Sequence, residues 1–145
     1  MKNSASINSS EKVYFLFSHN DDEFGIFPEL NKRISESKKD IHILYLTTPK
    51  SPKLRKIREQ ESIKILLKLG IDKNNIHFLG RGESIFIGEL DINLKIAFEA
   101  IIQVIMNKGL PKTVYSHAWE GGHKDHDASY IIAASLAKKY KILSN

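Results

Sequence analysis

The chain has 145 residues, 41% of them hydrophobic and 27% charged, which favours one globular domain with its own core. It contains no cysteine, so disulfides and thiolate metal sites are excluded, and a bound metal would need histidine, aspartate or glutamate ligands. The net charge is +5 and much of the excess lies between Lys50 and Lys68, but no nucleic-acid-binding motif accompanies it. We therefore expect a solvated basic helix face and no nucleic-acid partner.

Residues 1–11 are small and polar and lack the hydrophobic centre of a signal peptide. They predict a disordered lead-in to a domain that covers residues 12–145. Hydrophobic runs such as 13–17 are too short to cross a bilayer. Together with the absence of cysteine, this predicts a soluble cytoplasmic protein without a membrane span.

Four short runs rich in β-forming residues predict buried strands at 13–17, 41–47, 75–79 and 113–116. Helical patterns lie between and after them, at 27–38, at 54–69, from about Leu94 to a stop at Gly109, and at about 127–139. This alternation predicts an α/β fold in which helices cover both faces of a parallel sheet. Ligands of such sheets bind beyond the carboxyl ends of the strands.

The sequence SHNDDE at 18–23 directly follows the first predicted strand. Carboxylates this close together repel one another unless a cation compensates. His19 and Asp22 offer nitrogen and oxygen ligands for zinc or a similar divalent metal, and Asp21 beside them could take a proton from water. The alternative is that the acidic residues cap the next helix while His19 is solvated.

The sequence EGGHKDHD at 120–127 follows the fourth predicted strand and opens the last helix. Its two glycines allow a tight turn close to a ligand. His123 and His126 are three residues apart with Asp125 between them, so one histidine can bind a metal while the other faces the same cleft. The alternative is again a helix cap with exposed histidines.

The two motifs together make a stronger argument than either motif alone. In a parallel sheet both strand ends reach the same edge, so the motifs should lie side by side. His19, Asp22 and His126 would then form a three-ligand site. A catalytic zinc uses this number of ligands and keeps one position open for water.

The pair HNDDE at 19–23 and GHKDH at 122–126 resembles the HPDDE and HxDH signatures of the LmbE-like, or PIG-L, de-N-acetylase family. The stretches REQE, LGI and FLG, at 58–61, 69–71 and 78–80, are similar to further parts of that family. The resemblance covers nearly the whole chain. It implies a Rossmann-like three-layer sandwich with a mostly parallel sheet, and zinc-dependent removal of acetyl from an N-acetylated sugar.

Carried over residue by residue, the resemblance implies that His19, Asp22 and His126 bind Zn²⁺ or another divalent transition metal. Asp21 matches the general base that activates water. Asn20 stands where the family signature has proline. Family members usually continue past the second motif, so we expect a sheet that is short at its carboxyl-terminal end, in a fragment, a truncated product or a minimal variant. An open sheet edge would also favour oligomers.

Further side chains are candidates for contact with the substrate. His123 matches a histidine that stabilises the oxyanion or protonates the leaving amine, and Asp125 matches its partner. Arg58 matches a substrate-contacting arginine. Glu120 could bind a sugar hydroxyl while the ring stacks on Trp119, although that indole could equally anchor the loop.

Other readings of nearby residues stay open. Arg58 and Glu61 could form a surface ion pair of little consequence. His117 ends the fourth predicted strand and could support the metal ligands from behind. His42 and His77 fall inside predicted strands, away from the strand ends, and are expected to be structural.

The leading hypothesis is a metal-dependent N-deacetylase that acts on an N-acetylglucosamine-type small molecule or glycoconjugate. The alternative is a non-catalytic metal- or sugar-binding domain of the same fold. The intact Asp21 favours the enzyme, because a purely structural metal site needs no base.

Overall fold

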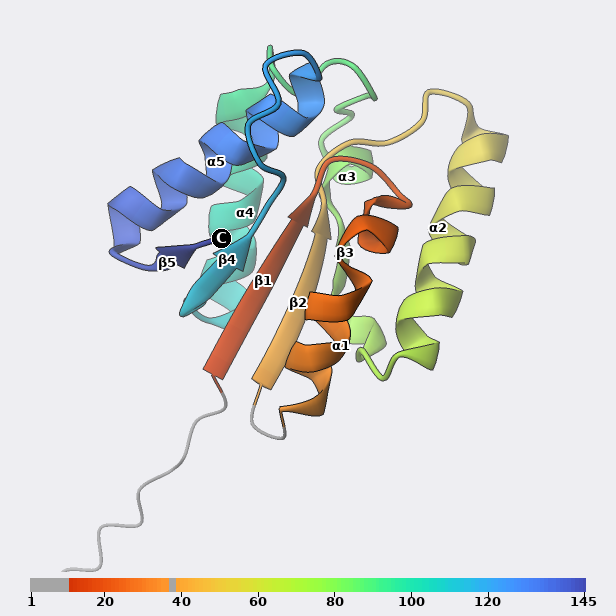
Figure 1. Ribbon diagram of the computed structural model, residues 1–145. Helices are drawn as coiled ribbons and strands as arrows, with labels where there is room; N and C mark the ends of the chain where they lie inside the picture. The colour runs from red at the N-terminus through yellow and green to blue at the C-terminus, as the bar shows by residue number, and fades with distance from the viewer. Residues whose placement is uncertain (1–10, 37–38) are drawn as a thin grey trace, which may run out of the picture.

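The computed structural model describes residues 11–36 and 39–145 and shows a sheet with helices on both faces (Figure 1). Its five strands are all parallel and lie in the order β3-β2-β1-β4-β5. They are β1 (Glu11–Phe17), β2 (Lys39–Tyr45), β3 (Ile76–Phe78), β4 (Thr113–Tyr115) and β5 (Leu143–Ser144). The predicted three-layer α/β fold is confirmed.

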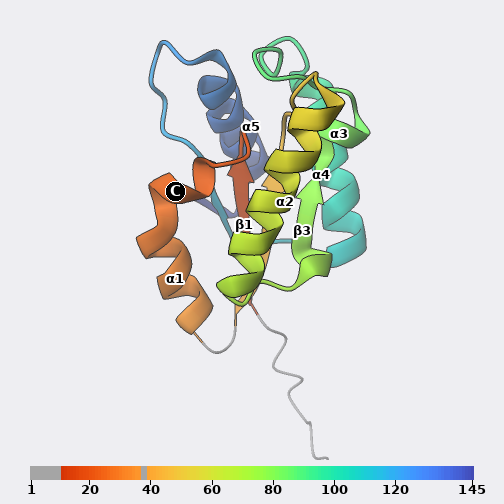
Figure 2. The same cartoon turned by 90° about the vertical axis from the view of Figure 1, so that its right-hand side faces the viewer.

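The longer helices are α1 (Phe27–Ser35), α2 (Pro52–Lys68), α4 (Leu94–Lys108) and α5 (Lys124–Tyr140). Short helical turns are η1 (Asp22–Ile26), η2 (Lys73–Asn75) and α3 (Leu79–Gly82). Figure 2 shows α1 and α2 in front of the sheet, with α4 and α5 behind it. None of the helices in the described part of the chain is long and apolar enough to span a membrane.

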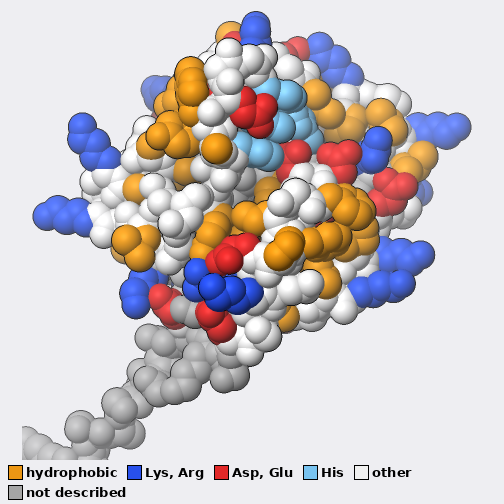
Figure 3. Space-filling model, in the orientation of Figure 1, with side chains coloured by type: hydrophobic (Ala, Val, Ile, Leu, Met, Phe, Trp, Pro, Cys, Tyr) orange, Lys and Arg blue, Asp and Glu red, His pale blue; other side chains and the backbone are white. Residues whose placement is uncertain are grey.

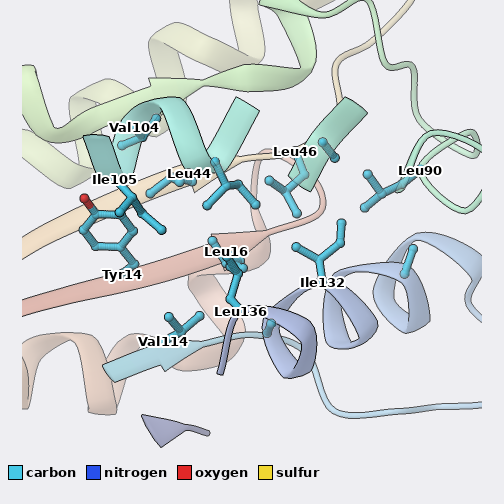
Figure 4. Close-up of a cluster of buried hydrophobic side chains, with 14 of the residues drawn as sticks. Tyr14, Leu16, Leu44, Leu46, Leu90, Val104, Ile105, Val114, Ile132 and Leu136 are labelled. Atoms are coloured by element: carbon cyan, nitrogen blue, oxygen red, sulfur yellow. The ribbon is translucent and has the colours of Figure 1, made fainter. Parts of the chain in front are cut away.

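Alternation along β1 divides the core between the two faces of the sheet. Val13, Phe15 and Phe17 pack into the cluster that includes Leu30 of α1. Tyr14 and Leu16 point the other way, into a cluster with side chains of α4 and α5 (Figure 4). All of these strand side chains are buried, which explains why this segment of the sequence is continuously hydrophobic.

The strand order reverses between β1 and β4, which are neighbours in the sheet but far apart in sequence. The chain leaves β1 toward α1 on one face of the sheet and leaves β4 toward α5 on the other face, so the two loops diverge and leave room for a ligand. The fold therefore places the ends of β1 and β4 at the natural binding position of such a sheet.

Several boundaries differ from the predicted ones. The strand predicted at 41–47 starts at Lys39 and ends at Tyr45, and the last helix starts at Lys124 rather than near Asp127. The short elements β5 and α3 were not predicted. Residues 37–38, at the end of the first predicted helix, and residues 1–10 of the predicted lead-in lie outside the described residues, whereas Glu11 begins β1.

Candidate metal centre

The loop after β1 and the first turn of α5 bring the two predicted motifs together. The ring centroids of His19 and His126 are 5.3 Å apart. His123 stacks on one face of His126 at 3.7 Å, and His117 stacks on its other face at 3.8 Å. Figure 3 shows the histidines as one group at the surface, with acidic side chains beside them.

The three predicted ligands point specific atoms toward one another. Asp22 Oδ1 lies 3.7 Å from His19 Nδ1 and 3.7 Å from His126 Nε2. His126 Nε2 is buried and has no hydrogen-bond partner among the described residues. A buried nitrogen without a partner is unfavourable unless it binds something, so this atom marks the centre of the cluster.

Each predicted ligand makes a hydrogen bond to another protein side chain on the side that faces away from the centre. His19 Nε2 lies 2.8 Å from Asp125 Oδ2, and His126 Nδ1 lies 2.8 Å from Glu120 Oε1. These carboxylates hold one ring proton on the nitrogens that face them, so in the neutral form of each ring His19 Nδ1 and His126 Nε2 carry the lone pair. Similarly, Asp22 Oδ2 is 2.9 Å from His117 Nε2, which leaves Oδ1 to face the centre.

The electrostatics of the cluster require a positive charge. Burial alone lowers the pKa of His19, but its hydrogen bonds to Asp125 and Asp22 outweigh burial and raise the pKa to about 9. Burial raises the pKa of Asp22, but hydrogen bonds from His117 and His19 outweigh it and hold the pKa well below its usual range. A proton on His19 supplies the positive charge here, and a divalent cation could take over that role.

Two overlapping sets of described side chains offer ligand atoms within 4.8 Å of one another. One set is His19, His123 and His126, and the other is Asp22, His117 and His126. No single set of described residues contains all three predicted ligands: His19 falls in one set and Asp22 in the other, and the two sets share His126. Imidazole and carboxylate donors, free lone pairs and an unpartnered nitrogen fit a divalent transition metal.

Asp21 lies beside this centre in an unusual backbone conformation. Its φ of 94° is in the left-handed region, which a residue with a side chain rarely adopts. Its backbone N–H donates to the buried carboxylate of Glu23 at 3.0 Å. Its own carboxylate is about half exposed, at 54%, and lies 3.7 Å from Arg58. The turn thus holds a strained residue where its carboxylate is open to solvent and substrate.

His123 is the N-cap of α5, where its Nδ1 accepts the backbone N–H of His126 at 3.4 Å. This contact leaves the proton on His123 Nε2. The resemblance implies Asp125 as the partner of His123, but the structure pairs this carboxylate with His19 instead. Asp125 is buried and also accepts the backbone N–H groups of Gly88 and Leu90 at 2.6 and 3.0 Å.

The predicted substrate contacts lie at the edges of the same region. Arg58 Nη1 is 3.8 Å from Glu61 as well as 3.7 Å from Asp21, so the expected surface ion pair is present together with a contact to the centre. Glu120 contacts His126, which is a role the sequence did not indicate. Trp119 is 57% exposed and meets Tyr130 edge to face.

Asp21 lines three clefts, and two of them also contain histidines of the candidate centre. The first, which we call the α2 cleft, has a volume of about 290 Å³ and is lined by His19, Asn20, Asp21, Pro49, Leu54, Arg58, Ile87 and His123. The second, the η1 cleft, has a volume of about 410 Å³ and is lined by Phe17, Asp21, Asp22, Gly25, Ile26, Ser116, His117 and His126. The candidate metal centre lies between them.

No pattern in the sequence indicated the role of residues 85–90, a segment whose backbone binds the Asp125 carboxylate. Thr48 forms a bridge with Phe86, and its backbone bonds to Ile85 and Ile87 tie this segment to the end of β2. Gly88 and Leu90 then present backbone N–H groups. No side-chain pattern reports such backbone donors, so only the fold reveals them.

The family comparison decides what kind of protein carries this site. A family model described as PIG-L, GlcNAc-PI de-N-acetylase, matches residues 14–137. The chain belongs to the PIG-L family. The match spans both motifs and confirms the resemblance seen in the sequence. No match was found among curated protein sequences.

Solved structures similar to this PIG-L chain include several deacetylases. A deacetylase of the teicoplanin biosynthesis pathway is 15% identical, with a TM-score of 0.66, and the match covers 92% of this chain and 65% of that one. The N,N'-diacetylchitobiose deacetylase of Pyrococcus horikoshii is 18% identical, with a TM-score of 0.69, and the match covers 88% and 49%. At these identities the likeness shows the fold alone.

The PIG-L chain spans 65% and 49% of the length of these two structures. A further neighbour is the 4-carboxy-2-hydroxymuconate hydratase of Pseudomonas putida, at 15% identity and a TM-score of 0.56, over 91% of this chain and 60% of that one. The same fold therefore carries different chemistry, and the site must decide the function.

Proposed function

We propose that the chain is a metal-dependent hydrolase that removes the acetyl group from an N-acetylated amino-sugar conjugate. The observation that supports it most is the set of three free ligand atoms, on His19, Asp22 and His126, each held from behind by another protein group. Membership of the PIG-L family and deacetylases among the structural neighbours support the same reaction.

In the proposed centre, His19, Asp22 and His126 would hold Zn²⁺ or another divalent transition metal. A metal bound there would supply Lewis acidity, which lowers the pKa of a water molecule and polarises the acetamide carbonyl. The ligand set does not choose between zinc and neighbouring metals.

The side chains around the centre account for the proton transfers. Asp21 takes the proton of the attacking water, since its carboxylate is exposed beside the centre. His123 donates from Nε2 to the oxyanion of the tetrahedral intermediate. Asp21 or His123 then protonates the amine nitrogen as the C–N bond breaks. Arg58 binds the sugar and holds the Asp21 carboxylate in place.

The test measures metal content and acetate release in the same preparations. The substrates are a panel of N-acetylglucosamine conjugates, and the variants are Asp21→Asn and His126→Ala. We expect Asp21→Asn to retain the metal but to lose about 10²–10⁴-fold in kcat/KM, because general base catalysis contributes that much. His126→Ala should lose the metal, and added Zn²⁺ should no longer raise its Tm.

Asp72→Asn is the matched control, since Asp72 caps the distant turn η2. It should keep both metal and activity. Stoichiometric metal without acetate release from any conjugate would favour a non-catalytic metal- or sugar-binding domain, which is the alternative function.

A further inference from the structure

The two clefts beside Asp21 differ in which catalytic groups they contact. The α2 cleft contains His123 and Arg58, whereas the η1 cleft contains Asp22, His117 and His126. Asp21 reaches both. A substrate whose scissile carbonyl lies at the centre can therefore extend in two directions from Asp21.

The chemistry of the amide assigns a direction to each half of the substrate. The amine nitrogen must receive a proton, and His123, the donor besides Asp21, lines the α2 cleft. Arg58 in that cleft can bind sugar hydroxyls. The sugar therefore occupies the α2 cleft, and the acyl group extends into the η1 cleft.

The η1 cleft is much larger than an acetyl group requires. Its volume is about 410 Å³, whereas a water molecule takes up about 30 Å³ of liquid and a methyl group is of similar size. Away from the centre its wall consists of Phe17, Gly25, Ile26 and Ser116, of which only the serine has a polar side chain. Figure 3 shows hydrophobic side chains below the histidines, over η1 and α1.

We infer that the η1 cleft is an acyl-binding site and that the chain also hydrolyses N-acyl amino sugars with straight acyl chains longer than acetyl. This inference rests on the proposed function and names its substrate class. The step is the same hydrolysis: the water oxygen bonds to the acyl carbon, the C–N bond breaks, and both protons of the water pass to the amine nitrogen through Asp21 and His123. The products are the carboxylate of the acyl chain and the protonated amino sugar.

Gly25 lines the η1 cleft, so a larger side chain at this position can test the inference. A Cβ placed on Gly25 meets nothing within 4 Å, and its φ lies outside the left-handed region. A leucine at this position would therefore fill space in the cleft without strain. Gly82 of α3 is the matched control, because a Cβ there also meets nothing within 4 Å and Gly82 lines neither cleft.

The activity test compares N-acetyl-, N-butanoyl- and N-hexanoylglucosamine. Each methylene that becomes buried can improve kcat/KM by up to about fourfold, so wild type should hydrolyse the hexanoyl substrate at least as well as the acetyl one. Gly25→Leu should lower the hexanoyl-to-acetyl ratio of kcat/KM by at least about tenfold, and Gly82→Leu should leave it unchanged. Acetate release without hexanoate release by wild type would overturn the inference and leave the proposed function intact.

A binding test separates the cleft from catalysis. The affinities of acetate, butanoate and hexanoate for the zinc-loaded protein are measured by calorimetry. We expect tighter binding with each added methylene in wild type and in Gly82→Leu, but not in Gly25→Leu. If no substrate releases its acid while this length dependence holds, the proposed function fails and the acyl site stands. An affinity that does not depend on length contradicts the site itself.

Discussion

At the scale of single residues, the contacts of His126 show which of its ring nitrogens faces the centre. Its Nδ1 lies 2.8 Å from the Glu120 carboxylate, while its Nε2 is buried and finds no hydrogen-bond partner in the described part of the chain. A carboxylate behind a histidine fixes the tautomer and makes the opposite nitrogen a better ligand. We therefore expect Glu120 to act through His126, and its predicted contact with a sugar stays a prediction.

The two roles for Glu120 predict different kinetics. If it orients His126, Glu120→Ala should weaken zinc binding by about 10–100-fold, while KM at saturating zinc changes little. Glu120→Gln keeps an acceptor oxygen and should lose less. Zinc affinity is measured by competition with a chelator. Unchanged zinc affinity with a raised KM would assign Glu120 to the substrate instead.

The predictability of the site follows from these contacts. The proximity of His19, Asp22 and His126 could be predicted because they stand in short motifs at strand ends, and the structure places them close together. Their role as metal ligands stays a prediction. The groups behind these side chains could not be predicted, because a hydrogen bond between side chains depends on how two loops pack. Asp125 is the clearest case, since it binds His19 and the backbone of a segment about 35 residues away in sequence.

At the scale of elements, α3 packs directly against the end of β2. Gly80 belongs to the FLG stretch that resembles the family, and its Cα faces the backbone of Thr47. A Cβ on Gly80 would overlap backbone atoms of Thr47, which cannot move aside as a flexible side chain can. The glycine is therefore needed for the close approach of the two elements.

We expect Gly80→Ala to destabilise the protein by about 1–3 kcal/mol, the usual effect of overpacking. Gly82→Ala in the same helix is the control, because its Cβ meets nothing within 4 Å. It should be neutral or slightly stabilising. Urea denaturation of the two variants measures the difference. Equal stabilities would mean that α3 shifts freely away from β2.

The same scale explains which elements could be predicted. β1 and β2 are long and mostly buried, so their hydrophobic runs identified them. β5 has two residues, and both are exposed, so no pattern marked it. The helix predicted from about Asp127 begins at Lys124 because His123, an unusual N-cap, accepts the backbone N–H of His126.

At the scale of the whole molecule, the sheet carries a pair of histidines on β2 and β3, separate from the group of histidines at the candidate metal centre. His42 Nδ1 lies 3.3 Å from His77 Nε2, and His42 Nε2 lies 3.3 Å from Asp40. Lys12 forms an ion pair with Asp40, and Lys108 adds a further positive charge nearby. The pair stands apart from the candidate metal centre, as predicted, and His42 is fully packed in the core.

This pair makes stability depend on pH. Burial lowers the pKa of both histidines, and that of His77 falls to about 4. Between about pH 4 and pH 6.5, the unfolded chain, whose histidines have a pKa near 6.5, therefore binds more protons than the folded chain. The stabilisation is complete above about pH 6.5 and is lost as the pH falls toward 4.

The expected loss is on the order of 1 kcal/mol, less than the full linkage value because the His77 ring is partly exposed. His77→Gln keeps a hydrogen-bonding group for His42 but removes one titration, so its free energy of unfolding should fall less between pH 6.5 and 4.5. Urea denaturation of the metal-free proteins across this range measures the slopes. Parallel slopes for the variant and wild type would show that His77 is protonated in the folded state, and the acid sensitivity would then belong to other groups.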